Sequence, residues 1–193
     1  TISAKLVEED YINQMFVAST HDYLMFITTA GKAYWVKVHE IPEGSKIGRG
    51  SHIKSLLKVS ANEDITTTVA LKDFREDEFL FMATANGVVK KTPTSEFRNA
   101  KDRGTTAVRL DDGDTLVSSI LTSGSDEILL VSRRGQALRI EENDVRPMGK
   151  TSRGVAGIKL GSSDELASAI RIEKEEDARI LVITEKGIGK RVD

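Results

Sequence analysis

The feature that most constrains the fold of this chain is a unit of about 50 residues that recurs along it. Four stretches share one pattern: a short apolar run, a turn that contains one glycine, and a second run with a basic residue near its end. They lie at 23–38, 78–92, 127–140 and 178–192, with turn glycines Gly31, Gly87, Gly135 and Gly187. A fixed period of this size is typical of propellers and arrays, in which each repeat is one supersecondary unit.

Each of the four stretches is predicted to be a β-hairpin. Asn86-Gly87 is the strongest signal, because a two-residue type I′ turn needs positive φ angles that Asn and Gly tolerate. The first three hairpins are each followed by an extended segment and then by an acidic turn and another strand. The extended segments are expected at 52–57, 106–110 and 156–160, and the later strands at 64–71, 114–121 and 164–170.

About four strands per repeat, with no apolar stripe of helical period, predict an all-β fold of propeller-like blades. We expect a single, partial domain over residues 1–193 with about three and a half repeats. A β-sandwich or barrel with coincidental turns is the alternative, and the constant order of the landmarks disfavours it.

A loop rich in Lys and Arg precedes each extended segment. The pair Arg-Gly recurs at 49–50, 103–104 and 153–154. The net charge of the chain is −2, yet the windows 46–54, 98–109 and 146–159 hold 11 of its 28 basic residues and a single acid, Asp102. If the repeats follow one another around a ring, equivalent loops lie on one rim, and that rim is positive.

A periodic basic rim suits a periodic polyanion such as double-stranded DNA, which carries about one charge per 1.7 Å of its axis. Gly beside Arg lets the backbone approach phosphates closely, and such a surface binds and bends the duplex without reading bases. Alternatively, basic loops merely discourage edge-to-edge pairing of sheets. The candidate DNA contacts are Lys46, Arg49, Lys54, Lys90, Lys91, Arg98, Lys101, Arg103, Arg139, Lys150, Arg153, Lys159, Lys190 and Arg191.

No motif of the sequence indicates catalysis or a cofactor. The stretch 148–151, Met-Gly-Lys-Thr, lacks the upstream glycine of a phosphate-binding P-loop, because position 144 is Asp. The three histidines share no ligand spacing, the chain has no Cys, and no Ser lies in a Gly-x-Ser-x-Gly elbow. We expect no catalytic residue, no metal site and no cofactor. No apolar run reaches the roughly 18 residues of a membrane span, so no membrane partner and a cytoplasmic location are expected.

Three stretches, at 8–43, 81–92 and 145–160, closely resemble the C-terminal domain of the DNA gyrase A subunit, and the similarity runs the length of the chain. The resemblance implies a bacterial β-pinwheel whose blades exchange strands and whose basic perimeter wraps DNA to support negative supercoiling. It also implies two partners, the gyrase B subunit together with the rest of the gyrase A subunit. ATP and magnesium would be used elsewhere in this type IIA topoisomerase, and the location would be at the nucleoid.

Two departures from the family pattern are evident. The family normally has six blades, whereas this chain supplies three repeats and the opening hairpin of a fourth. The gyrase box, Gln-Arg-Arg-Gly-Gly-Lys-Gly, is absent, and the loops at 46–50, 101–104 and 150–154 resemble degenerate copies of it.

Two alternatives stay open. The tail of the topoisomerase IV A subunit has fewer blades and no intact box, although the stretch 20–38 favours gyrase. From another class, a propeller-like protein-interaction scaffold would carry the same repeats, with basic loops that only solubilise its edges.

Overall fold

A computed structural model describes residues 14–15, 17–45, 48, 50–60, 62–172 and 179–192. The regular structure of these residues consists of β-strands and short 3₁₀ turns, so the predicted all-β class is confirmed. The strands are β1 (Tyr23–Thr28), β2 (Lys32–Lys37), β3 (Ile65–Leu71), β4 (Phe79–Thr84), β5 (Val88–Pro93), β6 (Thr105–Thr106), β7 (Leu116–Thr122), β8 (Glu127–Ser132), β9 (Ala137–Glu141), β10 (Val155–Ala156), β11 (Leu166–Ile172), β12 (Ile180–Ile183) and β13 (Gly189–Val192). The turns are η1 (Val38–Glu40), η2 (Ile53–Ser55), η3 (Thr94–Phe97), η4 (Lys101–Arg103) and η5 (Glu142–Asp144).

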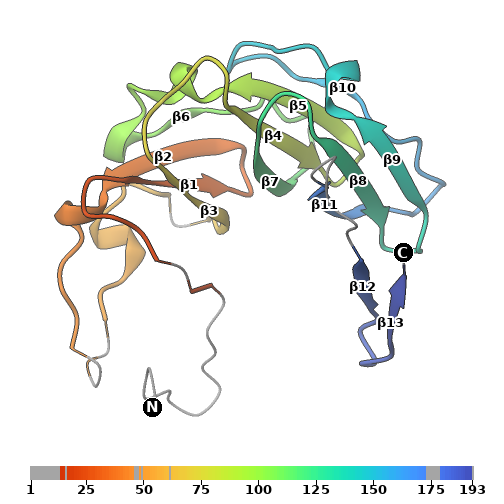
Figure 1. Ribbon diagram of the computed structural model, residues 1–193, viewed down its shortest axis with the longest axis horizontal. Coiled ribbons are helices and arrows are strands. Elements are labelled where there is room, and N and C mark those ends of the chain that lie inside the picture. The colour runs from red at the N-terminus through yellow and green to blue at the C-terminus, as the bar shows by residue number, and fades with distance from the viewer. Residues whose placement is uncertain are drawn as a thin grey trace.

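The strands form three successive antiparallel sheets and a separate hairpin. The strand orders are β3-β1-β2-β6, β10-β5-β4-β7, β11-β8-β9 and β12-β13. Figure 1 shows the three sheets following one another around an open arch, with β3, β7 and β11 on its inner side and β6, β10 and β9 on its outer side. This radial order is that of propeller blades.

The blades exchange strands, as the pinwheel resemblance implies. β6 comes after the second hairpin in the sequence but pairs with β2 of the first sheet, where Thr105 lies opposite Ala33. In the same way β10, from the third repeat, pairs with β5 of the second sheet, where Val155 lies opposite Val89. Each complete blade therefore takes its outermost strand from the next repeat. Within the described residues β9 has no such strand beside it and forms the outer edge of the third sheet.

The prediction of an extended segment at 52–57 is wrong, because residues Ile53–Ser55 form the 3₁₀ turn η2. The His52 side chain accepts a hydrogen bond from the Lys54 amide, and the Ser55 amide donates to the His52 carbonyl. These local bonds satisfy the backbone without a partner strand. The expected segments at 106–110 and 156–160 contain strand only at their starts, in β6 and β10.

The core lies between the blades. Successive side chains of a strand point to opposite faces, so a blade with a neighbour on each side is buried on both faces. In β4, Leu80 and Met82 pack into a cluster with the first blade, whereas Phe81 and Ala83 pack into a second cluster with the third blade. Trp35 of β2 is buried and donates its indole N–H to the Phe97 carbonyl at 3.0 Å, which joins the first blade to η3 of the next repeat.

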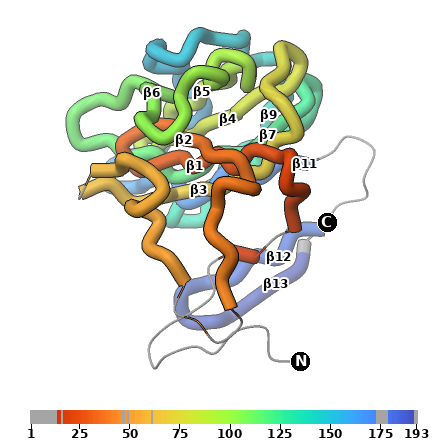
Figure 2. Tube along the Cα trace, turned by 90° about the vertical axis from the view of Figure 1, so that its left-hand side faces the viewer, coloured from red at the N-terminus to blue at the C-terminus, as the bar shows by residue number. Residues whose placement is uncertain are grey.

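The β12–β13 hairpin stands apart from the three sheets in both Figure 1 and Figure 2. Four of its apolar side chains are exposed, among them Leu181, 63% accessible to solvent, and Ile188, 70% accessible. It is the fourth hairpin of the repeat. Its turn glycine, Gly187, has a positive φ like the turn glycines of the other three hairpins, and the four values lie between 72° and 85°.

Candidate nucleic-acid interface

The loops at 101–104 and 150–154 are anchored on the outer perimeter in equivalent ways. Each loop leads into the short strand, β6 or β10, that adds to the outer edge of the preceding blade. Beyond β6, the amides of Ala107 and Val108 donate to the Gly31 carbonyl at 2.8 and 3.1 Å. Beyond β10, the amides of Gly157 and Ile158 donate to the Gly87 carbonyl at 2.9 and 3.3 Å. The hairpin turn of one repeat thus holds the loop of the next.

The glycine of each Arg-Gly pair lies where no side chain fits. Gly104 has a φ of 72°, and a Cβ at this position would collide with the buried ring of Tyr34. Gly154 has a φ of 106°, and a Cβ would lie 2.6 Å from the Val89 carbonyl oxygen. Both are left-handed conformations that favour glycine. Glycine is therefore required for packing on the preceding blade, and the adjacent arginine is held at the surface.

The second loop presents two exposed cations. The Lys101 ammonium and the Arg103 guanidinium form no ion pair within the described part of the chain. Lys101 has a φ of 45°, which is uncommon for a residue with a side chain. Asp102, the one acid of the basic windows, forms an ion pair with Lys58 at 2.8 Å. The hydrogen bond from Lys58 lowers the pKa of Asp102 below its ordinary value.

The cations of the third loop already have partners of their own chain. Arg153 is exposed and pairs with Asp111, and the Lys150 ammonium donates to the Glu96 carbonyl at 3.3 Å. Exposed pairs contribute about 0–1 kcal/mol, so a phosphate can displace them at little cost.

The remaining candidates are dispersed over the surface. Arg98 donates to the Phe74 carbonyl at 2.7 Å, and Arg139 on β9 pairs with Glu127. The other exposed candidates among the described residues are Lys54, Lys159, Lys190 and Arg191. Lys46 and Arg49 lie outside the described residues.

Lys90 and Lys91 must be withdrawn as DNA contacts, because both side chains are buried, with exposed fractions of 0% and 3%. The Lys90 ammonium donates to two backbone carbonyls, those of Ala107 and Lys150. The Lys91 ammonium donates to the Glu142 carbonyl at 3.1 Å and lies 3.7 Å from that residue's carboxylate. Neither ammonium can reach a phosphate outside the protein.

Burial lowers the pKa of Lys90 from its ordinary 10.5 to about 8, against a smaller opposing effect of Glu96. The unfolded chain therefore binds one more proton than the folded chain between pH 8 and 10.5. Stability contributed by this residue should rise with pH across that window, by at most about 1.4 kcal/mol per pH unit. Urea unfolding at pH 7.5 and 9.5 tests this: the free energy of unfolding should increase more between these two pH values in the wild type than in Lys90→Met. Equal gains would contradict it.

Two further exposed basic residues were not among the candidates. Arg109 and Arg146 are exposed, and both lie in the basic windows. The repeat itself contained the signal for Arg109, which follows Arg103 by six residues as Lys159 follows Arg153.

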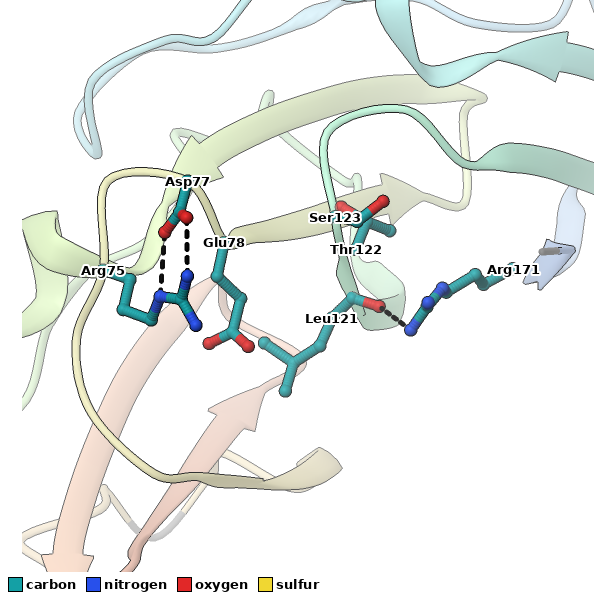
Figure 3. A pocket seen from close by; sticks show the side chains of 7 residues that line it. All are labelled: Arg75, Asp77, Glu78, Leu121, Thr122, Ser123 and Arg171. Carbon is teal, nitrogen blue, oxygen red and sulfur yellow. Dashed lines mark hydrogen bonds and ion pairs between the residues drawn. The ribbon is translucent and has the colours of Figure 1, made fainter. Parts of the chain in front are cut away.

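A pocket of about 370 Å³ lies between the start of β4 and the ends of β7 and β11 (Figure 3). Its cations are engaged within the protein: Arg75 forms a two-pronged pair with Asp77, and Arg171 lies 2.9 Å from the Asp126 carboxylate. Burial raises the pKa of Glu78 at its wall. The pocket offers no free cation for a phosphate, and no residue of the loops 101–104 and 150–154 lines it.

Across the part of the chain that the structure describes, no three His, Cys, Asp or Glu side chains are grouped to hold a metal ion. Nor do these residues include a helix long and apolar enough to cross a membrane.

Comparison with known proteins assigns the repeats. Residues 22–72, 78–123, 126–173 and 178–193 match the family described as the DNA gyrase C-terminal domain, beta-propeller. The chain belongs to this family. The DNA gyrase A protein of Salmonella typhimurium is 45% identical over 189 residues, which are 98% of this chain and 21% of that protein. Its counterpart from Treponema pallidum is 53% identical over 150 residues, 78% of this chain and 18% of that protein.

The chain thus spans about a fifth of the length of these gyrase A relatives. Solved structures agree on the fold. The C-terminal domain of a DNA topoisomerase IV superposes with a TM-score of 0.81 and 30% identity, over 89% of this chain and 53% of that one. A DNA gyrase A C-terminal domain superposes with a TM-score of 0.74 and 28% identity, over 90% of this chain and 55% of that one. The architecture is therefore common to both enzymes, and it is the sequence matches that carry the gyrase A assignment.

Proposed function

We propose that this gyrase-family domain binds double-stranded DNA without sequence preference on its outer rim and bends it there. The observation that carries the proposal is the repeated placement of Arg-Gly loops: two of them leave successive blades at equivalent points of the outer edge, with Arg103 and Arg153 exposed. A duplex that follows the rim would meet the same chemistry at each blade.

The proposed binding is electrostatic. Each Lys or Arg that neutralises a phosphate releases condensed counterions, whatever the base sequence. Backbone contacts position a duplex but do not read it, so sequence would enter only through the ease of bending. The exposed pair between Arg153 and Asp111 would open when a phosphate replaces the carboxylate.

We assign no catalytic residue and no cofactor to this chain. In a gyrase, ATP hydrolysis with magnesium and DNA strand passage would be performed by other parts of the assembly. The partners would be DNA, the gyrase B subunit, and the rest of the gyrase A subunit, in the cytoplasm at the nucleoid. A protein-interaction scaffold of the same fold is the competing hypothesis, and it requires no DNA binding.

DNA bending and topology test the proposal. The two ends of a doubly labelled duplex should approach one another when the chain is added, as measured by energy transfer. Circles ligated in its presence should show only a small change in linking number, because the gyrase box is absent from the sequence. An unchanged end-to-end distance would contradict bending. A large shift in linking number would show that the degenerate loops suffice for a chiral wrap.

A further inference from the structure

The buried side chain of Lys90 connects two successive basic loops. From β5 its ammonium donates to the Ala107 carbonyl at 2.5 Å and to the Lys150 carbonyl at 2.7 Å. Ala107 follows the loop 101–104, and Lys150 begins the loop 150–154. We propose that Lys90 is a positioning residue that sets the spacing of these two loops along bound DNA. The inference rests on the proposed DNA binding.

Other contacts join the same two segments and agree with this role. The Arg109 amide donates to the Ser152 carbonyl at 3.1 Å, and Arg153 pairs with Asp111. The Arg153 pair is exposed, so a phosphate competes for it. The bonds of Lys90 are enclosed, and DNA cannot displace them. They would hold the spacing of the loops while the surface charges change partners.

Packing alone does not call for a lysine at this position of the hairpin. Counted from the turn glycine, the equivalent residues are Tyr34, Leu138 and Lys190. Tyr34 fills its site with a ring against Gly104, and Leu138 is 40% exposed on the open edge of the third sheet. Burying an ammonium is unfavourable unless it is hydrogen-bonded. The two carbonyl bonds are thus what Lys90 adds over an apolar side chain.

The test compares wild type, Lys90→Met, Lys90→Arg and the exposed-lysine control Lys72→Met. Their affinities are measured for duplexes from about one helical turn, ~10 bp, upward. Met keeps the unbranched apolar part of the side chain and removes the ammonium with both bonds. Lys90→Met should bind the longer duplexes about three- to tenfold more weakly than wild type, because each flexible loop must be ordered separately. In the background Lys101→Ala with Arg103→Ala, which leaves one of the two loops to bind DNA, Lys90→Met should cause no further loss of affinity. Lys90→Arg keeps donors and should restore part of the loss, and Lys72→Met should match wild type.

Equal affinities of Lys90→Met and wild type at every length would overturn the inference while leaving DNA binding intact. An equal loss in the Lys101→Ala, Arg103→Ala background would also overturn it, because Lys90 would then act only through general stability. Failure of the wild type to bind any duplex would instead refute the proposed function, and the inference with it.

Amide hydrogen exchange on the wild-type chain provides a test that needs no folded variant. If one buried tether holds both loops, the amides of Arg109 and Ser152 should open with the same free energy, although they belong to different repeats. Unrelated protection of the two amides would overturn the tether.

Discussion

Glu142→Ala should lower the free energy of unfolding by about 3–5 kcal/mol, the usual cost of leaving a buried charge unpaired. The Glu142 carboxylate is fully buried, accepts the Thr122 hydroxyl at 2.6 Å, and lies 3.7 Å from the Lys91 ammonium. It also accepts the amides of Gly124 and Asp126 at 3.0 and 3.1 Å. Because Lys91 belongs to β5 and Glu142 to η5, the substitution would loosen the junction of the second and third blades.

Urea denaturation measures this effect, with exposed Glu76→Ala as the control that should change stability by less than about 0.5 kcal/mol. The double variant Lys91→Met with Glu142→Ala should be more stable than Glu142→Ala alone, since no unpaired ammonium is left. A loss below about 1 kcal/mol for Glu142→Ala, or no recovery in the double variant, would contradict this view of the junction.

Neutralising the basic loops should have the largest effect on DNA binding. At 0.1 M salt, alanine at both Lys101 and Arg103, or at both Lys150 and Arg153, should weaken binding about tenfold for each phosphate that is no longer neutralised. Each such phosphate should also reduce the salt slope by roughly one unit. The same outcome is expected for Lys46 with Arg49. Fluorescence titrations at several salt concentrations measure both quantities.

These variants should remain folded, because exposed charges of this kind contribute little to stability. Two controls accompany them. Lys72→Ala, just after the inner strand β3, should leave binding nearly unchanged. Substitution of Glu173, Glu175 and Glu176, outside the described residues, should leave it intact or improve it slightly. If the loop pairs affect DNA binding no more than these controls, the rim is not the binding surface.

The repeat made much of the fold predictable. A turn glycine must adopt positive φ whatever surrounds it, so Gly31, Gly87, Gly135 and Gly187 marked the hairpins by local chemistry alone. The Arg-Gly pairs could also be recognised in the sequence. Their glycines recur because Gly104 and Gly154 occupy positions where a Cβ would collide with the preceding blade.

What could not be predicted depends on neighbouring blades. The residues Lys90 and Lys91 look like a basic strand end in sequence, and alternation places them on opposite faces of β5. In an isolated sheet one of them would face solvent. Here loops and strands of the adjoining repeats cover both faces, so both ammonium groups are buried. Likewise, the segment 52–57 has the composition of its two counterparts but forms a 3₁₀ turn instead of adding to a sheet.

The most direct test of the central claim is the salt dependence of binding to duplexes of unrelated sequence. Two charges at each of three loops give about six phosphate contacts. With that number of contacts, the affinity of the chain for DNA should fall roughly a thousandfold between 50 and 200 mM salt. Duplexes of equal length and different sequence should bind alike at each salt concentration. Affinity that is unchanged between the two concentrations, or a strong preference for one sequence, would contradict a phosphate-binding rim.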